Sequence, residues 1–165
     1  MALEFAIEFP ARVNRLVLCS ISAQTSARCR AIVRSWLEIL KISGLKAMAW
    51  AALPVVFGNQ FLKDHQKMID KIVDAVVIRN SRDALIAQLD AVLNYPAPDI
   101  PADFDNPTLI ITGSQDPLVE PDDIRQLVHR CNGRHEKLSG IGHSIPAEAP
   151  EIFQKWVLEF IASGE

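Results

Sequence analysis

The strongest constraint on the fold is a short run of large apolar residues, Leu109, Ile110 and Ile111, between two threonines. Because the side chains of a strand alternate between its two faces, an unbroken apolar run is buried on both of them. Such strands are typical of parallel sheets that carry helices on each side. A second run, Leu16 to Leu18, predicts another buried strand, and residues 135–138 predict a short third one.

Helical spacing of apolar residues accounts for most of the remaining chain. Residues 1–9 and 147–162 each predict one helix, and Pro121 is suited to the first position of another. Between the first two strands, residues 26–95 predict a run of helices, the last of them capped by either Asn80 or Ser81. Strands that alternate with helices predict an α/β fold with a parallel sheet of about three strands.

Charge and hydropathy exclude several classes of partner. Lys and Arg number 17 against 20 Asp and Glu, with no basic stripe, so we expect no nucleic-acid partner. The longest apolar stretch, residues 47–58, contains Pro54 and falls short of the ~20 residues that cross a bilayer. Glu4 and Glu8 stand where a signal peptide would be cationic. We therefore expect a cytoplasmic protein with no membrane partner.

The cysteines and histidines show no metal-binding or disulfide pattern. Cys19, Cys29 and Cys131 have no paired spacing and are expected to be reduced thiols. Cys19 and Cys29 fit small buried residues better than nucleophiles. No His-x-x-x-His or Cys-x-x-Cys spacing supports zinc, and we expect neither a metal nor a cofactor.

Two loops at the ends of predicted strands carry the chemistry. Asp116 follows the second strand through Gly113, and His143 follows the third strand in a glycine-rich loop. Carboxyl ends of parallel strands meet at one edge of the sheet, and a histidine base needs a carboxylate to hold its tautomer. We expect Asp116 and His143 to be exposed and hydrogen-bonded, and substitution of either to change stability by under about 1 kcal/mol. Alternatively, Asp116 makes an Asx turn or caps a helix, and His143 is a solvated loop residue.

These loops resemble a known family. Residues 107–117, P-T-L-I-I-T-G-S-Q-D-P, together with G-I-G-H at 140–143 and Glu148 and Pro150 before an apolar helix, resemble the C-terminal part of an α/β-hydrolase. Residues 1–18 resemble the stretch that directly follows the nucleophile elbow in that family. The resemblance implies a partial α/β-hydrolase fold, with residues 1–25 and 96–165 as core and residues 26–95 as a helical lid.

By the same resemblance, Asp116 is the triad acid and His143 the triad base, in the chain order Ser, Asp, His. The family's nucleophile motif, G-x-S-x-G, is absent from this sequence. Gly142 and Ser144 begin it correctly, but Pro146 stands where the second glycine is required, and Ser144 follows the wrong strand. We therefore identify no nucleophile in this chain, and we expect the chain alone to be inactive.

The resemblance implies hydrolysis of an ester, a lactone or a related acyl or carbon–carbon bond, on a small apolar ester-, lactone- or ketone-type substrate. The serine would come from a missing segment or a separate chain. The alternative is a truncated, catalytically inactive module that binds a partner or ligand. Because the first strand, residues 15–19, would present a bare edge, we expect a homodimer or a complex with an N-terminal half.

Overall fold

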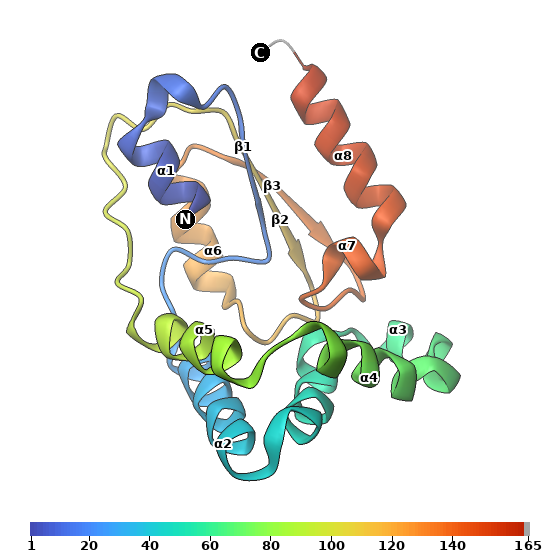
Figure 1. Ribbon diagram of the computed structural model, residues 1–165. Helices are drawn as coiled ribbons and strands as arrows, with labels where there is room; N and C mark the ends of the chain where they lie inside the picture. The colour runs from blue at the N-terminus through green and yellow to red at the C-terminus, as the bar shows by residue number, and fades with distance from the viewer. Residues whose placement is uncertain (164–165) are drawn as a thin grey trace.

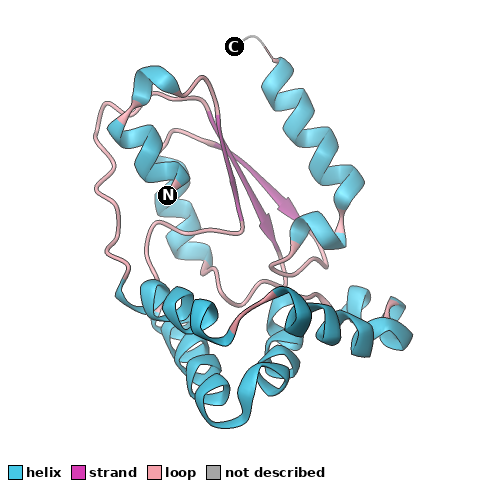
Figure 2. Ribbon diagram, in the orientation of Figure 1, coloured by secondary structure: helices cyan, strands magenta, loops and turns pink. Residues whose placement is uncertain are grey.

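The computed structural model describes residues 1–163, and in that range three strands form one parallel sheet. The order is β1 (Leu16–Cys19), β2 (Thr108–Gly113), β3 (Arg134–Leu138). Figure 2 shows the strands in magenta between the helices. The register pairs Leu16 with Thr108, and Leu109 with Arg134. The predicted class, a parallel sheet of about three strands with flanking helices, is confirmed.

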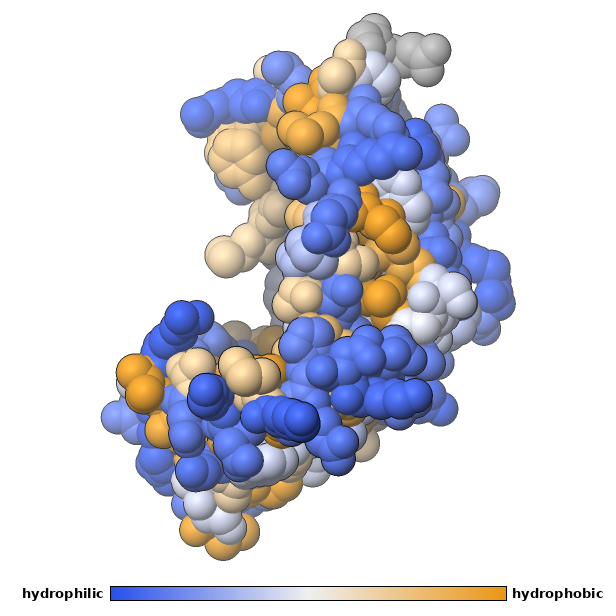
Figure 3. All heavy atoms as spheres, turned by 90° about the vertical axis from the view of Figure 1, so that its right-hand side faces the viewer, coloured by the Kyte–Doolittle hydropathy of each residue, from blue (hydrophilic) through white to orange (hydrophobic). Residues whose placement is uncertain are grey.

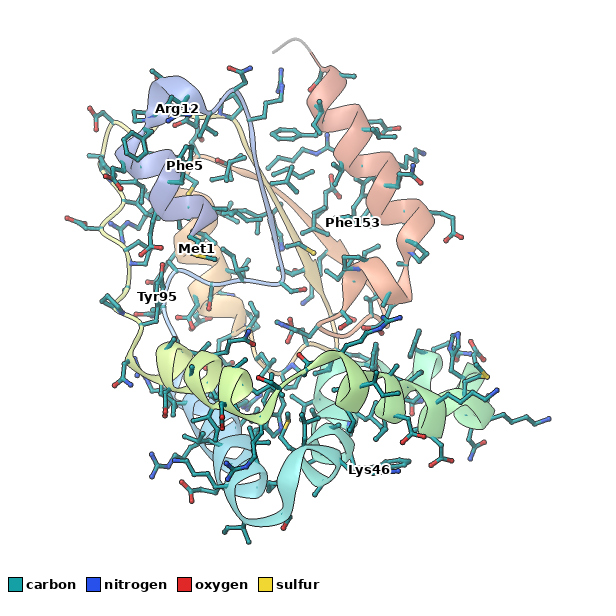
Figure 4. All side chains as sticks on the ribbon, in the orientation of Figure 1. Met1, Phe5, Arg12, Lys46, Tyr95 and Phe153 are labelled. Atoms are coloured by element: carbon teal, nitrogen blue, oxygen red, sulfur yellow. The ribbon has the colours of Figure 1, made fainter. Side chains whose placement is uncertain are left out.

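Helices cover both faces of this sheet (Figure 1). On one face, Leu16, Leu18 and Ile110 form a core cluster with residues of α1 (Ala2–Glu8) and α6 (Pro121–Arg130). On the other face, Leu109 and Ile111 pack with residues of α7 (Ile145–Glu148) and α8 (Pro150–Ala162). Figure 4 shows Phe153 extending from α8 toward the sheet. The central strand β2 is buried along its whole length, as its apolar run predicts.

The strand β1 is less buried than its apolar run predicts. Leu16 and Leu18 are buried, but Val17 and Cys19 on the opposite face are only half-buried. Helix α1 packs directly on the face that carries Leu16 and Leu18, whereas Val17 and Cys19 lie at the margin of the cluster that α7 and α8 cover. No described residue pairs with the second edge of β1.

A helical segment lies across the ends of the strands where they point downward in Figure 1. It contains α2 (Ala27–Val56), α3 (Asn59–Asp64), α4 (Ile69–Arg79) and α5 (Arg82–Asn94). A short 3-10 helix, Gln66–Met68, lies between α3 and α4, and another, Pro10–Arg12, lies outside the segment, after α1. The hydroxyl of Ser81 accepts the backbone N–H of Ala84, so Ser81 and not Asn80 caps α5. Ser26 caps α2 in the same way.

By length and composition, α2 is the one described helix that could cross a membrane, with a mean hydropathy of 1.5 in its most apolar window. The sequence pattern predicted no such segment, because the longest uninterrupted apolar stretch, residues 47–58, is too short to cross a bilayer. A single helix of this kind is weak evidence for a membrane span, since core helices of other proteins have the same length and composition. Gly44 (φ 80°) bends α2 into two legs, which pack on α4 and α5.

The C-terminal helix also differs from its prediction. Residues 147–162 were expected to form one helix, but the structure has the short α7 and the longer α8, which begins at Pro150. Ala149 lies between them with φ −142° and ψ 57°, outside the helical region. Because proline has no N–H and restricts the residue before it, a helix ends at this point although the apolar spacing continues.

Candidate active site

The ends of β2 and β3 bring Asp116 and His143 together. Asp116 lies three residues after β2, and His143 lies five residues after β3, so the paired strands deliver both loops to the same edge. The ring Nδ1 of His143 lies 2.8 Å from the Oδ2 of Asp116. The predicted hydrogen-bonding distance is confirmed. With Nδ1–H donating to the carboxylate, Nε2 is the ring atom left to accept a proton.

The two side chains differ sharply in exposure. The side chain of His143 is 33% exposed, whereas that of Asp116 is 1% exposed. The expectation that both are exposed is therefore wrong for Asp116. Its second oxygen, Oδ1, accepts the backbone N–H of Leu118 at 2.9 Å. The carboxylate thus makes the Asx turn and contacts the histidine at once, so the two interpretations of this residue are compatible.

Asp116→Ala is therefore expected to lower the free energy of unfolding by about 1–3 kcal/mol, because the buried N–H of Leu118 loses its acceptor. Urea unfolding followed by circular dichroism measures this change. Asp122→Ala is the matched control, because that carboxylate is 75% exposed and its ion pair with Arg125 contributes little. Equal losses in the two variants would contradict the structural role of Asp116.

The histidine loop lies directly against the end of β2. A Cβ added to Gly113 would lie 2.1 Å from the carbonyl oxygen of Gly142 and 2.4 Å from that of Ile141. The backbone N–H of Gln115 donates to the same Ile141 carbonyl at 2.8 Å. Only a residue without a side chain allows this approach, so Gly113 fixes the distance between the acid loop and the histidine loop.

Ser20 is a site residue for which the sequence suggested no role. It follows β1 with φ 52°, is 8% exposed, and its hydroxyl donates to the backbone carbonyl of His143 at 2.7 Å. A left-handed backbone conformation is strained for serine, so the surrounding structure must hold the Ser20 backbone in it. The one signal in the sequence is the position of Ser20 at the carboxyl end of a parallel strand, where ligand sites lie.

A cavity of about 520 Å³ opens beside His143. Its walls come from the start of α1, the end of β1, the first leg of α2, and α5; Met1, Cys29, Trp36 and Leu89 are among the lining residues. Tyr95 also lines this cavity, and Figure 4 shows it near Met1 on the left of the view. Figure 3 shows the surface hollowed between the helical segment and the α/β core. Its size and mostly apolar lining suit a small organic molecule.

Solved structures with this architecture carry hydrolase names. An α/β hydrolase, MGS-M2, from a Medee basin deep-sea metagenome library is 26% identical, with a TM-score of 0.86 over 99% of this chain and 62% of that one. The enol-lactonase from Burkholderia xenovorans LB400 is 21% identical, with a TM-score of 0.84 over 98% and 61%. A thermophilic esterase from Thermogutta terrifontis is 21% identical, with a TM-score of 0.79 over 97% and 60%. This chain has part of the α/β-hydrolase fold.

The chain spans about three fifths of the length of these α/β-hydrolases. No family model matches the sequence. No curated protein matches it either.

The candidate nucleophiles within this partial α/β-hydrolase fold are two cysteines that stay protonated and a serine, Ser144, that faces another cavity. Burial raises the pKa of the Cys19 thiol and of the Cys29 thiol, so both stay protonated at neutral pH although both line the cavity beside His143. The backbone N–H of Ser144 donates to the carbonyl of Val56 at 3.1 Å, and its side chain lines a second, smaller cavity of about 270 Å³ between α2 and α4.

The remaining three histidines belong to other contacts or elements, and His129 lies in the last turn of α6. His135 Nε2 is 2.9 Å from the hydroxyl of Thr112, and burial lowers its pKa, which favours the neutral ring. His65 stacks on Phe61 at the end of α3. Within residues 1–163, no three His, Cys, Asp or Glu side chains gather closely enough to hold a metal ion.

Proposed function

We propose that this chain carries the acid and base of an α/β-hydrolase that cleaves ester, lactone or related acyl bonds. One observation carries the proposal: the His143–Asp116 hydrogen bond of 2.8 Å beside a largely apolar cavity of about 520 Å³. The esterase and enol-lactonase among the similar structures support a small ester-type substrate. Residues 26–95 act as the lid, because α2 and α5 supply much of the cavity wall.

The mechanism uses a serine from outside this sequence. That serine's hydroxyl attacks the carbonyl carbon of the substrate while Nε2 of His143 takes its proton, and Asp116 holds the ring and stabilises the imidazolium. The tetrahedral intermediate expels the alcohol, which takes the proton back from His143. Water, deprotonated by the same nitrogen, then attacks the acyl-serine, releases the acid and restores the serine hydroxyl.

The position of Met1 supports the proposal that the serine comes from a segment leading into α1. Met1 and Ala2, at the start of α1, line the same cavity as His143. A G-x-S-x-G segment that leads into α1 would therefore place its serine beside the histidine. Cytoplasmic location is part of the proposal, in agreement with the three free thiols within the described residues.

The test is hydrolysis of p-nitrophenyl esters of increasing acyl length. We expect no rate above background from the 165-residue chain, and a measurable rate from the protein expressed with the coding sequence that precedes Met1 in its gene. If that sequence encodes no G-x-S-x-G and neither protein hydrolyses esters, the second candidate stands: a catalytically inactive binding module.

Assembly through the edge of β1 is part of the proposal. Val17 on that strand is half-buried, and Phe5 and Phe9 of α1 are 42% and 39% exposed. A strand edge beside exposed aromatic groups favours pairing with an N-terminal half or with a second copy of the chain.

Val17→Lys is expected to abolish this assembly, because a lysine on an edge strand opposes pairing. Size-exclusion chromatography with light scattering measures the mass at micromolar concentration. Ile78→Lys, at an 82% exposed position on α4, tests the alternative that the lid helices form the interface. A monomeric native chain, or dissociation caused by Ile78→Lys alone, would refute pairing through β1.

A further inference from the structure

The carboxylate of Glu148 joins the histidine loop to the helical segment. Its Oε2 accepts the backbone N–H of Gly58 at 2.8 Å and that of Gly142 at 3.0 Å, and its Oε1 lies 3.1 Å from the same Gly142 nitrogen. Gly142 directly precedes His143, and Gly58 lies between α2 and α3. One side chain thus holds two backbone segments that lie 84 positions apart in the chain.

The backbones of the two segments are also in direct contact. The carbonyl of Val56 at the end of α2 accepts the N–H of His143 at 2.9 Å. A Cβ added to Gly58 would lie 2.5 Å from the carbonyl oxygen of Gly140 and 2.9 Å from the Glu148 carboxylate. No side chain fits between the segments, so the position of the histidine backbone depends on this junction.

The acid loop is attached to the same junction. The side-chain oxygen of Gln115, the neighbour of Asp116, accepts the backbone N–H of Asn59 at 2.7 Å. Residues 56–59 therefore bind both loops whose side chains form the pair. On the histidine side, Gly140 and Gly142 give the loop many accessible conformations, so its geometry requires a restraint from outside.

We propose that Glu148 is a positioning residue that holds His143 in hydrogen-bonding geometry with Asp116. Hydrogen bonds from backbone N–H groups to a carboxylate are stronger than those to a neutral acceptor. Glu148 restrains the loop at the residue before His143, while Val56 restrains His143 itself. The inference rests on the proposed function for its catalytic meaning, although the geometry it concerns is measurable without catalysis.

The test compares Glu148→Ala, Glu148→Gln and the control Glu151→Ala by NMR of the histidine rings in the 165-residue chain. Glu151 is an exposed carboxylate in the first turn of α8. We expect Glu148→Ala to speed solvent exchange of the His143 Nδ1–H by about ten-fold or more and to mix the ring tautomers. Glu148→Gln keeps one accepting oxygen, so we expect a smaller change. Glu151→Ala is expected to match the native chain.

Thermal unfolding of each variant separates positioning from stability. If Glu148→Ala unfolds at a lower temperature while the His143 signals stay native, Glu148 is structural only and the proposal falls. It also falls if neither quantity changes. If Glu148→Ala does not fold, Glu148→Gln decides. Native ring signals and a native exchange rate of the His143 Nδ1–H in Glu148→Gln would overturn the proposal, and faster exchange would support it. Failure of ester hydrolysis alone would remove the proposed function and leave this result standing.

Discussion

Asp116→Asn is expected to lower the rate of ester hydrolysis by about 10⁴-fold in the protein assembled with the proposed serine-bearing segment. The asparagine oxygen can still accept the N–H of Leu118, which the Oδ1 of Asp116 now accepts at 2.9 Å. Its NH₂ group then faces the Nδ1 of His143, which favours the tautomer with the proton on Nε2. That nitrogen can no longer take the proton of the serine.

The same substitution separates catalysis from folding. Because the Asx turn keeps its acceptor, we expect Asp116→Asn to lose much less stability than Asp116→Ala. Asp122→Asn, on the exposed start of α6, is the matched control and is expected to keep the native rate. Initial rates on a p-nitrophenyl ester measure both variants. An Asp116→Asn protein that keeps a tenth of the native rate would remove Asp116 from the mechanism.

The sequence predicts the sheet and the placement of the pair because both depend on short-range patterns. The apolar run Leu109 to Ile111 requires cover on both faces, and β2 is buried throughout. Once the strands are parallel neighbours, the loops after β2 and β3 must meet at one edge. The hydrogen bond between Asp116 and His143 follows from that topology.

The contacts that hold the pair in place could not be predicted in the same way. Ser20 reaches the carbonyl of His143 across 123 positions, and Glu148 reaches Gly58 across 90. No periodicity encodes such a contact, because it depends on how the helical segment packs on the core. The half-buried face of β1 was not predicted for a related reason: an apolar run within one strand does not show how far the helices on each face of the sheet reach over it.

Gly113→Ala is expected to lower the free energy of unfolding by about 3 kcal/mol, at the upper end of what overpacking a core produces. The added Cβ would lie 2.1 Å from one backbone carbonyl oxygen and 2.4 Å from another, in the loop that carries His143. Backbone atoms cannot rotate away as a side chain does, so the whole loop must move. We therefore also expect the Nδ1–H signal of His143 to be lost.

Gly44→Ala is the matched control for this substitution. Gly44 has φ 80°, and a Cβ added there would meet nothing within 4 Å. Its cost is backbone strain alone, about 1–3 kcal/mol, because φ 80° with ψ −179° is a conformation that only glycine adopts readily. Urea unfolding of the two variants compares a clash at the site with backbone strain at the bend of α2. A Gly113→Ala protein as stable as Gly44→Ala, with the His143 signal intact, would show that the loop yields without cost and that the close approach does not fix the site.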